Sequence, residues 1–183
     1  FTAYALSNAI GFSFATAPAA RARFYRKDAT PAQVAAVSAV TGALMMIGGA
    51  CAAALGLIAG REAPLWQALG AAILVGVAVG GWATGRFAWG EKALGPRPRR
   101  RLALQVLAAT ADWACAAGVL YVLLPDGAGT YPAFLATFVI AGLLGAVSGA
   151  PGGAGVFEAT ILALSPGHTS SVLAALIAYR VVY

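Results

Sequence analysis

The sequence predicts an all-α, polytopic membrane protein, a helical bundle with broken or re-entrant half-helices. Of its 183 residues, 61% are hydrophobic and only 10% are charged, whereas soluble domains have roughly 45–50% apolar and about 25% charged residues. The long runs of Ala, Leu, Val and Gly do not alternate as the strands of a membrane β-barrel would. Glycine- and proline-rich breaks interrupt these runs, and they predict the broken helices.

The first predicted helix, Thr2–Ala17, is more polar than the others and ends before Pro18. Two interpretations stay open for its hydroxyl and amide groups. They line a polar cavity, or they form hydrogen bonds between packed helices. The polar positions are Ser7, Asn8, Ser13 and Thr16.

The next helix is predicted to start at Thr30–Pro31, because proline favours the first turn of a helix. Four apolar stretches then reach the length of about 20 residues that a spanning helix needs. They are Val34–Ala59, Leu65–Ala83, Leu102–Leu124 and Pro132–Ala150. The small residues of the first stretch predict close helix packing. With the shorter segments, we expect about six or seven hydrophobic segments in one membrane domain, residues 1–183.

The distribution of charge predicts orientation. The formal net charge is +6, and 10 of the 12 Lys and Arg residues fall in Arg21–Lys27 and Arg86–Arg101. Two predicted spans separate these clusters, so both lie on one side, which the positive-inside rule makes cytoplasmic. The clusters lack an RNA-binding motif, and we interpret them as topology signals that attract anionic membrane lipids. No nucleic acid partner is expected.

The sequence gives little support for a metal site or a disulfide bond. Cys51 and Cys115 lie singly in apolar stretches, and the one histidine has no HExxH context. We expect no cofactor and no metal site. The chain opens without Met or a signal peptide and stops in an apolar run, so we also expect a fragment truncated at both ends.

Two charged residues lie in apolar stretches where charge is expensive. Asp112 falls near the centre of Leu102–Leu124, and Arg180 lies in the last apolar run beside Tyr179. Such residues usually serve function or pair with another charge. The alternative for Asp112 is a carboxylate that a neighbouring helix satisfies purely for packing specificity. The alternatives for Arg180 are snorkelling and a structural ion pair.

The stretch SGAPGGAGVFEATILAL, from Ser148, contains the most informative break. Proline and the glycines Gly152, Gly153 and Gly155 end one helix, and VFEATILAL starts another with Glu158 in its first turn. Irregular backbone is not tolerated against lipid, so the break is expected to be buried in protein or to line a watery cavity. Broken helices of this kind mark substrate sites in transporters. The alternative is a plain loop with Glu158 as a helix-start acid.

Four islands resemble the membrane domain of bacterial lysylphosphatidylglycerol synthase/flippases, also called multiple peptide resistance factors. They are RARFYR from Arg21, LATADWACAAGVLYVLLP from Leu107, SGAPGGAGVFEATIL from Ser148 and LIAYRVVY from Leu176. The resemblance implies translocation of aminoacylated, chiefly lysyl, phosphatidylglycerol across the bacterial cytoplasmic (inner) membrane. It also implies resistance to cationic antimicrobial peptides. Complete members carry a cytoplasmic synthase domain that uses aminoacyl-tRNA, and these residues do not include it.

The resemblance suggests how the lipid head would bind. Arg21, Arg23 and Arg180 would hold the phosphate, while Asp112 and Glu158 would receive the ammonium groups. The glycine break would admit water and backbone donors. The remaining expected binding residues are Tyr25, Tyr179, Gly152, Gly153 and Gly155. Homo-oligomerisation and the lysyltransferase activity of the parent stay open.

Two other classes stay open. A secondary transporter of a small polar solute would show an internal repeat, for which TAPAARAR and GAPGGAGVFE form only a loose pair. A membrane-embedded lipid transferase would need a nucleophile–base pair or a cluster of metal-binding acids, and none is apparent.

Overall fold

The computed structural model describes residues 30–60, 63–84, 99–125, 129–164 and 169–182. Within these ranges the chain forms helices and no strands, as the sequence predicts. The elements are α3 (Pro31–Gly60), α4 (Pro64–Thr84), α6 (Arg99–Leu123), α7 (Tyr131–Ser148), the short 3₁₀ turn η1 (Pro151–Gly153), α8 (Val156–Leu164) and α9 (Thr169–Val182).

Helix α3 begins where the sequence predicts. The backbone N–H of Thr30 donates to Oε1 of Gln33 at 2.9 Å, and the N–H of Gln33 donates to the Thr30 hydroxyl at 3.3 Å. This reciprocal pair is a capping box, which satisfies two N–H groups that have no partner inside the helix. Pro31 occupies the first helical position, where its missing N–H costs nothing.

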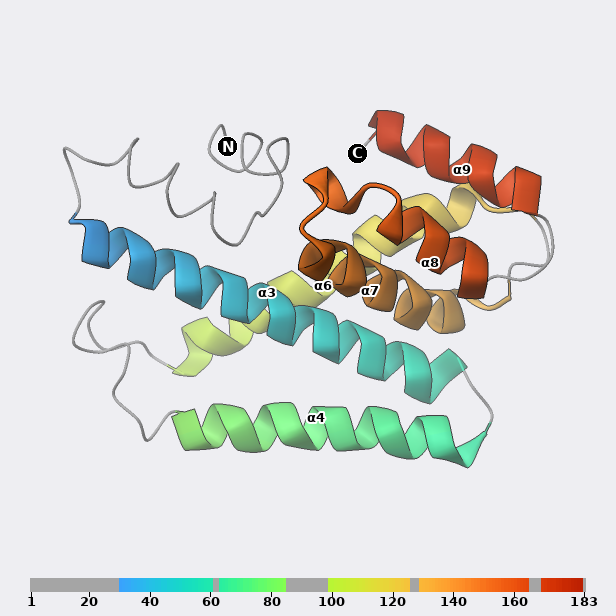
Figure 1. Cartoon of the computed structure of the whole chain (residues 1–183). Helices are drawn as coiled ribbons and strands as arrows, with labels where there is room; N and C mark the ends of the chain where they lie inside the picture. The colour runs from blue at the N-terminus through green and yellow to red at the C-terminus, as the bar shows by residue number, and fades with distance from the viewer. Residues whose placement is uncertain (1–29, 61–62, 85–98, 126–128, 165–168, 183) are drawn as a thin grey trace.

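The long helix α3 packs against α4, α6 and α7, and these four helices are called the α3 layer below (Figure 1). Glycines bring these backbones together. A Cβ added at Gly56 would lie 2.5 Å from the carbonyl oxygen of Pro132, and one added at Gly48 would lie 2.5 Å from Cβ of Ala109. The predicted role of small residues is confirmed at these contacts. Gly42 differs, because no described residue lies within 4 Å of an added Cβ there.

Trp113 of α6 contacts both α3 and α7 and so links the three helices. Its Nε1–H donates to the backbone carbonyl of Met45 in α3 at 3.1 Å. Its ring lies against Gly49 of α3 and Gly142 of α7, where added Cβ atoms would lie 3.1 and 2.7 Å from ring carbons. A glycine on each side therefore makes room for the indole between the helices.

Among the described residues, three helices, α3, α6 and α7, are long and apolar enough to cross a membrane. The four long apolar stretches of the sequence coincide with α3, α4, α6 and α7. Many large apolar side chains are exposed along these helices, including Val75, Val122 and Val147, and lipid would cover such surfaces. The chain is an all-α membrane protein.

The carboxyl-terminal part is built from shorter pieces. Helix α8 has nine residues, about 14 Å at 1.5 Å per residue, which is less than half of the roughly 30 Å hydrocarbon core. It packs against α7, and α9 then packs against α8 and α6 (Figure 1). The predicted half-helix after the break is therefore present as α8.

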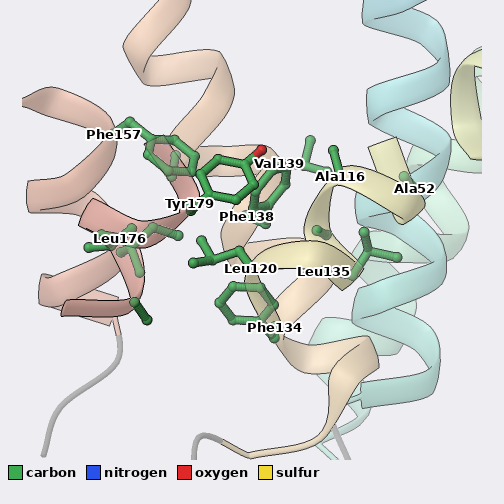
Figure 2. Packing of buried hydrophobic residues seen from close by; sticks show 14 of the residues in the cluster. Ala52, Ala116, Leu120, Phe134, Leu135, Phe138, Val139, Phe157, Leu176 and Tyr179 are labelled. Atoms are coloured by element: carbon green, nitrogen blue, oxygen red, sulfur yellow. The ribbon is translucent and has the colours of Figure 1, made fainter. Parts of the chain in front are cut away.

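Aromatic rings join these shorter helices to α7. Phe138 of α7 makes edge contacts with Phe157 of α8 and Tyr179 of α9, at centroid distances of 5.4 and 6.1 Å. Figure 2 shows these rings beside one another, with Leu120 and Leu176 in the same cluster. This aromatic cluster supports the residues of the candidate site.

Candidate functional site

The break between α7 and α8 is held open by glycines in conformations that other residues rarely adopt. Helix α7 ends with Gly149 in the left-handed region, and Gly152 and Gly153 follow with φ of 58° and 67°. Gly153 also packs closely on α7, since a Cβ added there would lie 3.0 Å from Cα of Gly145. The predicted helix break is thus formed by backbone geometry that requires glycine.

Glu158 is the third residue of α8, and its carboxylate caps that helix. Oε2 accepts a hydrogen bond from the backbone N–H of Gly155 at 2.7 Å. This bond is one half of a capping box, here made by the acidic residue alone. The expectation of an acid in the first turn of the restarted helix is confirmed.

The other oxygen of Glu158 pairs with Arg180. Nε of Arg180 donates to Oε1 of Glu158 at 2.6 Å, and this is the one ion pair found within the described ranges. Nη1 of the same guanidinium donates to the carbonyl oxygen of Gly152 at 2.8 Å. Arg180 therefore connects α9 to both the start of α8 and the break.

The ring of Phe157 forms one side of this group. The guanidinium carbon of Arg180 lies 5.7 Å from the Phe157 ring centroid, within the range of a cation–π interaction. Phe157 is itself stacked on Tyr179 at 6.2 Å. The predicted binding residue Tyr179 is 5% exposed, so its ring belongs to the core that supports Arg180.

Part of the hydrogen-bonding capacity of Arg180 is not used by the residues that the structure describes. Its side chain is 38% exposed, against 20% for Glu158. A guanidinium has five N–H groups, and two of them are used in the bonds to Glu158 and Gly152. Among the described residues, no bond is found to the other three.

Asp112 lies on an exposed position of α6 and makes no ion pair with another residue of the described ranges. Its chain neighbour Trp113 packs edge-on against Phe138, with centroids 6.2 Å apart. Tyr179, the neighbour of Arg180, packs on the same ring. The rings of Trp113 and Tyr179 thus contact the same side chain of α7, whereas no ion pair joins Asp112 to Arg180 within the described ranges.

The sequence predicts that the break is either buried in protein or exposed to a water-filled cavity, and the burial of its residues tests the first of these. Gly153 is buried, but Pro151, Gly152, Ala154 and Gly155 are exposed. Burial in protein therefore holds for Gly153 only. If the break lies at membrane depth, its exposed part must face water.

Three predicted residues, Arg21, Arg23 and Tyr25, lie outside the described residues, as does the loose repeat candidate TAPAARAR. Sequence reasoning missed Phe157 and the carbonyl of Gly152 as contacts of Arg180. Phe157 directly precedes Glu158, but nothing in the local pattern distinguishes it from an ordinary core residue. Within the described ranges, no group of three or more His, Cys, Asp or Glu side chains could hold a metal ion.

Comparison with known proteins gives two partial matches, and no protein-family model matches the chain. The chain is 47% identical over 75 residues to the uncharacterised protein slr0712 of Synechocystis sp., covering 39% of this chain and 23% of that protein. It is 34% identical over 97 residues to the inner membrane protein YbhN of Escherichia coli K12, covering 51% of this chain and 30% of that protein. The matched regions are less than a third of either relative. About half of the chain is thus similar to a bacterial inner membrane protein.

Proposed function

We propose that this protein translocates aminoacylated phosphatidylglycerol, in particular the lysyl form, across the bacterial cytoplasmic membrane. The observation that carries the proposal is the guanidinium of Arg180, which is oriented at a helix break and has three N–H donors without a partner among the described residues. The membrane fold and the similarity to an inner membrane protein support the proposed location in the cytoplasmic membrane.

The chemistry of the lipid head explains why such a group is needed. The head carries a phosphate anion and, when lysylated, two ammonium groups. Moving it through a hydrocarbon core of about 30 Å requires polar partners at depth. A guanidinium fork matches the oxygens of a phosphate, so Arg180 would bind the phosphate there. Arg21 and Arg23 would add to this binding.

The acidic residues differ in what they can offer an ammonium group. Asp112 is exposed on α6 and is the carboxylate available to the lysyl head. Glu158 already accepts hydrogen bonds on both oxygens. Synthesis of the lipid from aminoacyl-tRNA would belong to a separate cytoplasmic domain of the parent protein. Display of the cationic lipid outside would repel cationic antimicrobial peptides.

The test is leaflet exchange in proteoliposomes that contain the intact protein and fluorescent lysyl-phosphatidylglycerol or phosphatidylglycerol. We expect exchange of the lysyl lipid well above the protein-free rate, and loss of most of this activity in Arg180→Gln. Thr41→Ala, an exposed change on α3, serves as the control and should match the wild type. A wild-type rate equal to that of empty liposomes would contradict the proposal and favour a transporter of small solutes.

A further inference from the structure

We propose that Glu158 is a positioning residue, which aims Arg180 at the phosphate of the lipid head and does not itself bind the ammonium groups. This inference rests on the proposed function and assigns separate roles to the two acids. Arg180 and Asp112 would contact the head, and Glu158 would act through Arg180.

The hydrogen bonds of the carboxylate support this division. Oε1 is 2.6 Å from Nε of Arg180, and Oε2 is 2.7 Å from the N–H of Gly155. Charge-assisted bonds of this length are among the stronger ones in proteins. Each carboxylate oxygen could accept a second bond, but the negative charge of Glu158 is already paired with Arg180. An ammonium group would therefore compete with the guanidinium for the same charge.

The guanidinium is fixed from three directions. Glu158 holds Nε, the carbonyl of Gly152 holds Nη1 at 2.8 Å, and the ring of Phe157 lies 5.7 Å from the central carbon. A free arginine side chain has many rotamers, and ordering it on binding costs free energy. Because these contacts order Arg180 beforehand, its remaining donors face a ligand without that cost.

The positions of the two acids also set the expected selectivity. Phosphate is common to phosphatidylglycerol and its lysyl form, whereas the added ammonium groups belong to the lysyl form. A residue that acts through the phosphate-binding arginine should affect both lipids equally. A residue that binds ammonium should affect the lysyl lipid alone.

The experiment compares the exchange rates of the two lipids in proteoliposomes of the intact protein. Glu158→Gln keeps the length and an acceptor oxygen but removes the charge. We expect both rates to fall by about tenfold, as for loss of a charge-assisted bond, with their ratio unchanged. The matched control Asp112→Asn should lower the lysyl rate and spare the other. In an Arg180→Gln background, Glu158→Gln should cause no further loss.

Two results would overturn the assignment. One is a Glu158→Gln protein that loses lysyl transport but keeps the rate for phosphatidylglycerol. The other is an additional loss when Glu158→Gln is combined with Arg180→Gln. A wild-type protein that moves neither lipid would instead refute the proposed function, and the assignment with it.

A second variant covers the case in which Glu158→Gln does not fold. Arg180→Lys keeps a cation that can pair with Glu158. It loses the planar guanidinium that donates to Glu158 and to Gly152 at the same time. We expect both lipid rates to fall with an unchanged ratio and with normal elution of the purified protein. Full rates in this variant would show that the positioned fork is not needed, and would overturn the proposal.

Discussion

Glycine serves different purposes in the two halves of the molecule. Along α3 it removes side-chain volume, so that the backbones of α6 and α7 approach closely at Gly48 and Gly56. At the break it supplies positive φ at Gly152 and Gly153 and exposes a carbonyl that Arg180 uses. Among the described residues, the contacts of α3 combine packing with the hydrogen bond from Trp113 to Met45, and the ion pair lies beside the break.

This difference has a physical origin. Lipid tails are as apolar as leucine, so helices in a membrane associate through close packing and not through exclusion of water. The α3 layer follows that rule. A charged pair is expensive at depth, and the binding role proposed for Arg180 would account for its presence beside α8.

The largest expected effect tests the close packing of α3. Gly56→Ala would place Cβ 2.5 Å from the carbonyl oxygen of Pro132, and backbone atoms cannot easily move away. We expect a loss of about 2–3 kcal/mol of stability, measured as a lower thermal unfolding midpoint in detergent. Gly42→Ala, on the same helix with free space around it, should leave the midpoint unchanged or raise it. Equal midpoints for the two variants would show that this close contact is unimportant.

The second effect tests the break. Gly152 has φ of 58°, and a Cβ there would lie 3.2 Å from Nη1 of Arg180. We expect Gly152→Ala to cost about 1–2 kcal/mol through backbone strain and also to lower lipid exchange by displacing the guanidinium. Gly129→Ala, with φ of 86° and nothing nearby, should show the strain alone. Normal lipid exchange in Gly152→Ala would show that the position of the guanidinium beside Gly152 is not needed for transport.

The third effect tests the bonds that fasten α6. Trp113→Phe removes the bond to the carbonyl of Met45, and Tyr131→Phe removes the 2.7 Å bond from the Tyr131 hydroxyl to the carbonyl of Ala114. Loss of each bond should cost about 1 kcal/mol, read from the same unfolding midpoints. Trp113→Phe should cost more than Tyr131→Phe, because it also removes ring atoms that contact Gly142. Val122→Ala, at a position that is 82% exposed, should have no effect. A silent Trp113→Phe would mean that packing of the ring holds α6 without the bond.

The smallest effect concerns the start of α3. Thr30→Ala removes the hydroxyl that accepts from Gln33, and we expect a loss of about 0.5 kcal/mol, at the low end for an exposed cap. Thr41→Ala, which removes an exposed bond to the carbonyl of Val37 within the helix, should cost less. If Thr41→Ala proved the more harmful of the two, the capping interpretation would be wrong.

The sequence predicted the elements well where local signals are strong. The Thr30–Pro31 start, the four long apolar helices and the restart after Pro151 appear in the structure within a few residues of the predicted bounds. Apolar run length, proline and glycine carry these predictions, and each acts over only a few neighbouring residues.

The candidate site was predicted less completely. The sequence analysis singled out Glu158 and Arg180, but it did not pair them with each other. The two residues are separated by 22 positions, and their contact requires α9 to return beside α8. The aromatic ring beneath Arg180 was missed because Phe157 carries no polar signal.

The sequence by itself determined that this is a helical membrane protein, where its long helices lie, and that glycine and proline interrupt one of them beside an acid. Those properties follow from composition and from short-range backbone preferences. Only the tertiary structure decided which charges meet, which glycines allow close contact and which ring supports the arginine. Such contacts depend on how helices pack across the bundle, and residue order alone does not encode that geometry locally.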